Sequence, residues 1–280
     1  MKFSMEQGEP AIMGVDDSPL GAAVTARDHD VIAMVQNALK RGDVMLAFQP
    51  VVPANGAAQP AFYEGLIRVL DPSGRVIPAR DFITVVETSE TGREIDCAAL
   101  RLGLRELVAT PDLRLAINMS ARSIGYPRWN RILNNTLSGN PTVAERLILE
   151  ITESSAMIMP DLVTVFMRDL QKKGIAFALD DFGAGFTSFR YLREFYFDIL
   201  KIDGQFIRGV CDNADNQVLT AALIAIGQHF DMFTVAESVE CAEDAEFLQS
   251  AGIDCMQGYY FAAPSIHPHW RQQSPLKKRA

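Results

Sequence analysis

The sequence reads Phe177-Ala178-Leu179-Asp180-Asp181-Phe182-Gly183-Ala184-Gly185-Phe186-Thr187-Ser188 where an apolar run meets two adjacent carboxylates and then a loop with two glycines. The apolar run is typical of a buried strand. Because successive side chains of a strand point to opposite faces, Asp180 and Asp181 can enter one site only where the strand is ending. Two unit charges about 4 Å apart repel by roughly 4 kcal/mol at an effective dielectric constant near 20. The pair therefore predicts a bound cation, most simply a metal ion.

Apolar runs and amphipathic segments alternate on both sides of this stretch, beginning with a helix over residues 27–40. Strands are predicted at 45–52, 62–70, 113–119, 146–152, 175–180, 199–202, 233–237 and 255–261, with helices at 93–108, 127–137, 160–173, 188–195, 217–230 and 242–251. This alternation predicts an α/β fold, a modified (β/α)8 TIM-like barrel. The first two strands are close enough to pair, so the first strand is expected to be antiparallel to the others. A doubly wound open sheet is the alternative.

Composition and charge limit the classes of function. Residues 1–26 lack periodicity and are expected to form a flexible leader, whereas residues 266–280 form a polar, basic tail. No apolar run is long enough to span a membrane. The net charge of −9 argues against binding of a nucleic-acid polymer, but it is compatible with a small phosphorylated ligand. The four cysteines lack CxxC spacing, which predicts free thiols and a cytoplasmic location.

Seven consecutive predicted strands each carry a polar residue within or at the end of an apolar run. These residues are Glu64, Asn118, Glu150, the pair Asp180 and Asp181, Lys201, Glu237 and Gln257. Burying such a group without a partner is costly. Each one alone has a structural explanation: Lys201, for example, could pair with Asp198 or Asp203. Together they predict one site, because a barrel brings the carboxyl ends of its strands to one mouth.

The chemistry of this predicted site favours hard divalent cations. Carboxylate and amide oxygens are ligands for Mg²⁺, Mn²⁺ or Ca²⁺, and no histidine or cysteine belongs to the set. Adjacent aspartates can share two ions, so two-metal hydrolysis of a phosphodiester is the predicted reaction. Lys201 could orient or help deprotonate the attacking water, or neutralise the phosphate. The loop over residues 183–188 lacks a complete GxGxxG or P-loop pattern, and its glycines with Thr187 and Ser188 could instead gate the site.

These residues resemble the motifs of the EAL domain family, the cyclic di-GMP phosphodiesterases. The matching segments are Glu64-Gly65-Leu66 with Ile67-Arg68, Asn118-Met119-Ser120, Glu150-Ile151-Thr152-Glu153, Asp180-Asp181-Phe182-Gly183-Ala184-Gly185, Leu200-Lys201-Ile202-Asp203 with Phe206-Ile207, Ala236-Glu237-Ser238-Val239-Glu240, and Gln257-Gly258-Tyr259 with Phe261 and Pro264. The resemblance covers roughly residues 30 to 265, so residues 27–265 are expected to form an EAL phosphodiesterase domain. It also implies a barrel with an antiparallel first strand.

The resemblance implies hydrolysis of cyclic di-GMP to linear pGpG by two-metal in-line water attack, which lowers the level of this second messenger. It implies two Mg²⁺ or Mn²⁺ ions, with Ca²⁺ expected to inhibit. It also suggests a homodimer and leaves room for a regulatory protein partner. Two alternatives stay open: a catalytically silent receptor that binds cyclic di-GMP and signals through a partner, and a TIM-barrel metal enzyme with an unrelated substrate.

Position by position, the resemblance also implies a role for each site residue. The first metal would be held by Glu64, Asn118, Glu150 and Asp180, with Asp180 bridging to a second metal held by Asp181 and Glu237. Lys201 resembles the residue that contacts the nucleophilic water, and it is expected to act in catalysis with Glu64, Asp180 and Glu237. Arg68, Gln257 and Asp203 are expected to contact or order the substrate, and Glu153 to brace the loop after Asp181.

The sequence departs from the family pattern at three places. Gly65 stands where the family has Ala, and Ser238 where it usually has Gly. The family's loop tyrosine is replaced by Phe186, although Thr187 retains a hydroxyl. None of these changes removes a predicted metal ligand, but Gly65 is expected to loosen a strand beside one.

Overall fold

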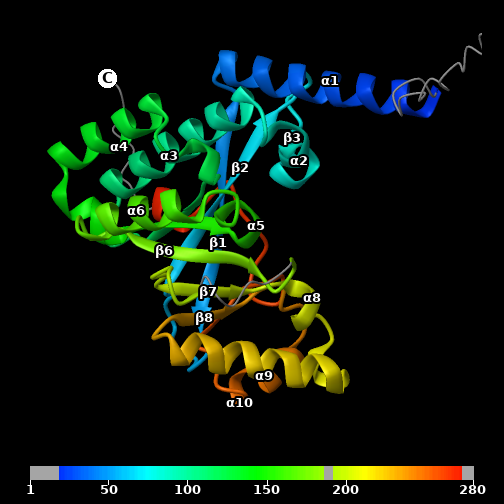
Figure 1. Ribbon diagram of the computed structural model, residues 1–280, viewed down its shortest axis with the longest axis vertical. Helices are drawn as coiled ribbons and strands as arrows, with labels where there is room; N and C mark the ends of the chain where they lie inside the picture. The colour runs from blue at the N-terminus through cyan, green and yellow to red at the C-terminus, as the bar shows by residue number, and fades with distance from the viewer. Residues whose placement is uncertain (1–18, 186–191, 273–280) are drawn as a thin grey trace, which may run out of the picture.

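The computed structural model describes residues 19–185 and 192–272 (Figure 1). The predicted leader therefore lies mostly outside the described residues, as does the end of the basic tail. Most of the helix predicted at 188–195 and the proposed gate residues Thr187 and Ser188 also lie outside them. Within the described residues, no helix is both long and apolar enough to cross a membrane.

Eight strands close into a barrel, and a ninth extends it at one edge. The strands are β1 (Val44–Pro53), β2 (Phe62–Leu70), β3 (Val76–Pro78), β4 (Leu115–Asn118), β5 (Leu147–Thr152), β6 (Ala176–Phe182), β7 (Ile199–Ile202), β8 (Phe233–Ala236) and β9 (Cys255–Met256). The barrel closes because β1 pairs with both β2 and β9, while β3 pairs only with β2. Both pairings of β1 are antiparallel, and the pairings from β2 through β4 to β9 are parallel. The antiparallel first strand is confirmed, and the open-sheet alternative is wrong.

Helices cover the outside of the barrel. They are α1 (Pro19–Arg41), α2 (Ile83–Val86), α3 (Glu90–Ala109), α4 (Pro127–Gly139), α5 (Glu153–Ala156), α6 (Pro160–Gln171), α8 (Gly204–Ile207), α9 (Ala214–His229), α10 (Ala242–Ser250) and α11 (His269–Gln272), with 3-10 turns η2 (Ala79–Asp81), η3 (Ala121–Ser123), η4 (Pro141–Arg146) and η5 (Val210–Asp212). Figure 1 shows α3, α4 and α6 on one side of the barrel, α9 and α10 on the other, and α1 reaching out beyond it. α1 begins at Pro19, eight residues before the start predicted at residue 27.

Several helix boundaries follow from local chemistry. α4 and α6 begin with Pro127 and Pro160, whose fixed φ suits the first helical position. Asn213 caps α9 by accepting a hydrogen bond from the Asn216 amide at 3.1 Å. After α6 the chain reverses at Gly174, where φ is +94°, a backbone conformation that glycine adopts without a steric penalty.

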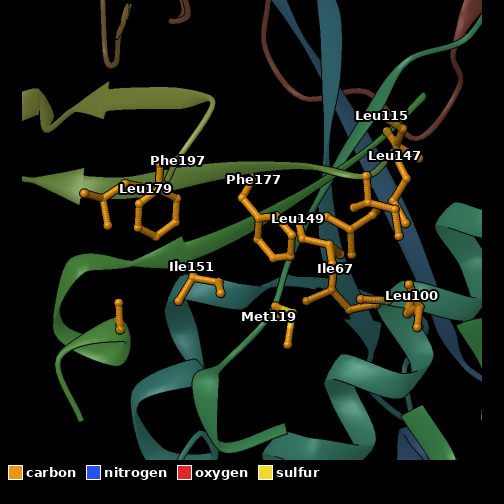
Figure 2. Close-up of a cluster of buried hydrophobic side chains, with 14 of the residues drawn as sticks. Ile67, Leu100, Leu115, Met119, Leu147, Leu149, Ile151, Phe177, Leu179 and Phe197 are labelled. Atoms are coloured by element: carbon orange, nitrogen blue, oxygen red, sulfur yellow. The ribbon is translucent and has the colours of Figure 1, made fainter. Parts of the chain in front are cut away.

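The two faces of the strands form two separate cores. Toward the helices, large apolar side chains of the strands and of the surrounding helices pack together, including Leu100, Leu115, Leu149 and Phe177 (Figure 2). Inside the barrel lies a smaller cluster with one residue from each of the eight barrel strands. This interior apolar layer consists of Val51, Phe62, Ala116, Ile148, Ala178, Ile199, Val235 and Cys255. Because strand side chains alternate, the next inward position is two residues further along each strand.

The last strand is shorter than predicted, ending at Met256 instead of residue 261. The Gln257 amide still bonds to the Ala236 carbonyl, but the chain then turns at Gly258. A Cβ at Gly258 would lie 2.0 Å from the Val239 carbonyl oxygen, so only glycine permits this approach of two backbones. The turn thereby directs the segment after Gln257 across the barrel mouth.

The segment after residue 264 packs on the outside of the first hairpin. Ser265 forms a β-bridge with Phe48, and the Trp270 ring lies 5.1 Å from that of Phe48 and 4.7 Å from that of Tyr63. Arg271 makes two hydrogen bonds to the Glu106 carboxylate, at 2.8 and 3.1 Å. The part of the predicted polar tail that the structure describes is therefore held against β1, β2 and α3.

Candidate metal centre and substrate cavity

The polar residues of the site follow the interior apolar layer by two positions in each strand. This places them in a second inward layer at the carboxyl ends of the parallel strands, where they face the barrel mouth. The second layer consists of Glu64, Asn118, Glu150, Asp180, Lys201, Glu237 and Gln257. Gln49 of β1 completes it. Because β1 is antiparallel to its neighbours, its polar residue lies two positions before Val51 instead of two positions after it. All seven predicted strand positions thus converge at one mouth.

The two adjacent aspartates reach the site by different routes. Asp180 is buried and points inward from β6. The pairing of β6 with β7 shifts register between Leu179 and Phe182, and Asp181 has a left-handed φ of +55°. This irregularity turns Asp181 away from the outer face and into the wall of the mouth cavity. The strand therefore presents two carboxylates in succession without ending at Asp180.

Lys201 stands at the centre of the acids. Its side chain is fully buried, and its Nζ lies 2.8 Å from Glu237 Oε1, 2.9 Å from Asp180 Oδ1 and 3.1 Å from Glu150 Oε2. Glu64 Oε2 is slightly farther, at 3.6 Å. The alternative pairing of Lys201 with Asp198 or Asp203 is wrong: Asp198 accepts hydrogen bonds from the Phe177 amide and Gln171.

The charges around Lys201 are unbalanced. Burial disfavours the ammonium, but the surrounding carboxylates outweigh it and raise the pKa of Lys201 well above its ordinary value. Burial and the neighbouring acids raise the pKa of Glu150 and of Glu237 despite the attraction of Lys201. Burial and the charge of Asp180 raise the pKa of Asp181 to about 6. One ammonium cannot balance so many acids, and further positive charge would stabilise their ionised forms.

The donor set fits divalent metal ions. Carboxylate oxygens of Glu64, Glu150 and Asp180 lie within 4.8 Å of one another, as do those of Asp180, Asp181 and Glu237. Asp180 belongs to both groups. Among the described residues, buried Glu150 Oε1 has no hydrogen-bond partner, so this oxygen is available to a metal ion. Oxygen-only donors in two groups that share a carboxylate suit hard cations such as Mg²⁺ or Mn²⁺.

Amide side chains fix the orientation of Glu64. Asn118 Nδ2 donates to Glu64 Oε1 at 2.8 Å, and Gln257 Nε2 donates to Glu64 Oε2 at 2.6 Å. Gln257 in turn donates to Gln49 Oε1 at 3.1 Å, and Gln49 donates to the Ala262 carbonyl. These bonds and the attraction of Lys201 outweigh the effect of burial, so the pKa of Glu64 is lowered. The carboxylate is therefore held ionised and in one position.

A cavity of about 560 Å³ opens above the acids. Its wall includes Glu64, Asp181, Glu237 and Gln257 together with three arginines, Arg68 from β2, Arg80 from η2 and Arg208 after α8. The volume is within the range of small-molecule sites, roughly 300–1,000 Å³. Acids at the floor and guanidinium groups on the wall suit a ligand that carries phosphates and binds with metal ions.

Two other predicted residues occupy different places. Glu153 Oε2 accepts a hydrogen bond from the Gly183 amide at 3.1 Å, which is the predicted contact with the loop after Asp181. Asp203 lies at the N-cap of α8, where its Oδ1 accepts from the Gln205 amide at 2.7 Å. It is not among the described residues of the cavity wall, so its substrate contact stays a prediction.

Several wall residues were not among the predicted site residues, including Gln49, Arg80, Arg208 and Tyr259. Gln49 interrupts an apolar strand in the same way as Glu64 and Glu150, so its signal was present in the sequence. Arg80 and Arg208 lie outside the strands, in segments without periodicity, and only the packing of these segments brings them to the cavity.

Comparison with known proteins agrees with this architecture. The EAL domain family model matches residues 32–264. The cyclic di-GMP phosphodiesterase PdeF of Escherichia coli is 31% identical over 242 residues, which are 84% of this chain and 32% of that protein. The cyclic di-GMP phosphodiesterase PdeB of Shewanella oneidensis is 30% identical over 234 residues, 82% of this chain and 27% of that protein. The chain thus spans about a third or less of these relatives.

A solved structure gives the same result. The PaMucR phosphodiesterase in its c-di-GMP complex matches with a TM-score of 0.74 and 28% identity, covering 87% of this chain and 99% of that one. The barrel has an antiparallel first strand and acids at its mouth, and the EAL family model matches most of the sequence. The chain therefore belongs to the EAL domain family.

Proposed function

We propose that the chain hydrolyses cyclic di-GMP to linear pGpG and so lowers the level of this second messenger. The observation that carries the proposal is the pair of acid groups that share Asp180 beneath a cavity walled by arginines. The choice of cyclic di-GMP as the substrate rests on the relatives that are named cyclic di-GMP phosphodiesterases. One water would add to phosphorus as one phosphodiester bond of the ring breaks, leaving a linear dinucleotide with a terminal phosphate.

The residues of the chain divide into ligands and substrate contacts. Two divalent ions, Mg²⁺ or Mn²⁺, would activate the water and screen the phosphate oxygens when bound. Glu64, Asn118, Glu150 and Asp180 would hold the first, and Asp180, Asp181 and Glu237 the second. Ca²⁺, which accepts irregular oxygen geometry, is expected to occupy these ligands and inhibit.

The remaining residues position the reactants. Lys201 lies against four of the acids and would present its ammonium to the attacking water. Arg68 would contact the substrate from the cavity wall, and Gln257 would keep Glu64 oriented. Glu153 would hold the loop after Asp181 through Gly183.

Chromatographic measurement of pGpG tests this proposal. Wild-type protein should form pGpG from cyclic di-GMP with Mg²⁺ or Mn²⁺ and not with EDTA, and Glu64→Ala and Lys201→Ala should each lower kcat by at least about 100-fold. Lys172→Ala, which removes an exposed lysine from the end of α6, serves as the matched control and should leave kcat unchanged. Absence of metal-dependent pGpG from folded wild-type protein would contradict the proposal. Calorimetric binding of cyclic di-GMP without turnover would instead assign the chain a receptor role.

We further propose that the chain acts in the cytoplasm, as a homodimer that a regulatory protein partner can control. Light scattering coupled to gel filtration tests the dimer: a mass of one chain at the concentrations of the activity assay would refute it.

A further inference from the structure

Ser238 has a backbone conformation that serine rarely adopts. Its φ is +56°, and it directly follows Glu237 at the cavity wall. Such left-handed residues other than glycine persist where the surrounding structure fixes them. Glycine would adopt the same conformation without strain, so the side chain of Ser238 destabilises this position unless its contacts compensate.

The serine side chain is built into its surroundings. A Cβ at Gly204 would lie 2.5 Å from Ser238 Oγ and 2.6 Å from Ser238 Cβ, so the absence of a side chain at Gly204 makes room for the serine. In this position Ser238 Oγ accepts a hydrogen bond from Arg208 Nη2 at 3.0 Å. The hydroxyl thus joins the segment after β8 to the segment after β7.

Arg208 is held at two points above the cavity. Besides Ser238, its Nε lies 3.6 Å from Glu240 Oε1. The Arg208 side chain is 57% exposed even with these contacts, so without them it would sample many rotamers. Fixing a long side chain before binding removes the entropic cost of ordering it when the ligand arrives. Arg208 lines the same cavity as Arg68 and Arg80 but comes from a different part of the chain.

We propose that Ser238 is a positioning residue that holds the Arg208 guanidinium ready to contact an anionic oxygen of the bound cyclic dinucleotide. The inference rests on the proposed function for its substrate. A cyclic dinucleotide carries two phosphates, and metal ions held by the acids at the cavity floor would contact only the one that is cleaved. Arg208 supplies a charge-assisted donor on the wall for an oxygen outside that centre. Glycine at position 238 would relieve the strain but would lose the hydroxyl that orders Arg208.

A double-mutant cycle tests this assignment. The variants are Ser238→Ala, Arg208→Gln and the two combined, with Arg105→Gln as a control that removes an exposed arginine of α3 outside the cavity. Affinity for cyclic di-GMP is measured by calorimetry with Ca²⁺ in place of Mg²⁺, and kcat and KM are measured with Mg²⁺. Circular dichroism and melting temperature establish that each variant is folded.

Ser238→Ala is expected to weaken binding about threefold to tenfold and to raise KM without changing kcat. In the Arg208→Gln background the same substitution should have no further effect, because its target is gone. Equal losses in both backgrounds, or a fall in kcat alone, would overturn the inference and indicate that Ser238 acts on Glu237. Unchanged affinity of Ser238→Ala would also overturn it. Failure of wild-type protein to bind cyclic di-GMP would instead refute the proposed function.

Ser238→Gly provides an independent readout. Relief of the left-handed serine should raise the melting temperature by about 1–3 °C while binding weakens as in Ser238→Ala. A glycine variant that is more stable and binds as tightly as wild type would show that the hydroxyl has no part in recognition.

Discussion

Lys201→Met removes the central cation of the acid cluster while keeping the length of an unbranched side chain. In wild-type protein, Lys201 Nζ contacts four carboxylates from separate strands and is fully buried. Removing one partner from a buried ion pair typically costs about 3–5 kcal/mol, because the remaining charge stays buried without compensation. We expect a loss of this size in EDTA at pH 8.

The melting temperature gives a direct measure. Unfolding entropy near 60 °C is about 2.1 cal/mol/K per residue, so for a chain of 280 residues the expected loss corresponds to about 5–9 °C. Lowering the pH should reduce the deficit, because carboxyls with raised pKa in the folded state take up protons and the stability they lose at high pH returns. Lys172→Met, which removes an exposed ion pair, should change stability by less than about 0.5 kcal/mol.

Divalent ions should then rescue the variant. Binding to the folded state alone stabilises by about 2.7 kcal/mol when the ion is present at 100 times its dissociation constant. Mg²⁺ should therefore raise the melting temperature of Lys201→Met more than that of wild type. Equal melting temperatures for the two proteins in EDTA, or a variant that does not respond to any divalent ion, would refute the argument that unbalanced acids dominate this site.

Three further predictions concern residues outside the metal centre. Burial raises the pKa of Asp96 to about 7, so the contribution of Asp96 to stability should fall as the pH rises from about 4 to 7. In urea unfolding, Asp96→Asn should gain on the order of 2–3 kcal/mol relative to wild type between pH 5 and pH 8, and parallel pH curves would contradict this. Gly103→Ala should lower the free energy of unfolding by about 1–2 kcal/mol although alanine has the better helix propensity, because its Cβ would lie 2.6 Å from Ile117 Cδ1. Adding Ile117→Val should recover part of this loss in the same assay. Arg271→Ala should lower the free energy of unfolding by about 1.5–3 kcal/mol with kcat unchanged, because it removes both hydrogen bonds to a Glu106 carboxylate that is only 9% exposed. An unaltered melting temperature would show that α11 does not stabilise the barrel.

The centre of the site was predictable because strand periodicity and burial act on the same residues. Glu64, Glu150 and Lys201 each interrupt an apolar run at an inward position. Pairing with residues nearby in the sequence does not account for all three, whereas a shared site does. Barrel closure then brings them together without any information from the loops. The same reasoning applied to Gln49 would have completed the set.

The cavity wall was less predictable, since it depends on contacts between segments distant in sequence. Arg208 is one of several exposed arginines, and nothing nearby in the sequence distinguishes it from Arg105. Its place follows from the packing of α8 against the segment that carries Ser238. Trp270 lies in a polar tail whose composition predicts a solvated end, yet its ring packs against Phe48 and Tyr63.

The alternation between the interior apolar layer and the residues above it has a consequence for how such a protein can vary. Each ligand is aimed by its distance, in residues, from an apolar neighbour such as Ile148 below Glu150 or Ala178 below Asp180. Inserting or deleting a single residue within any of these strands would rotate its ligand to the outside of the barrel. Changes of length are therefore expected in the connections after the strands. There they can alter which molecule the cavity binds while the arrangement of the acids stays the same.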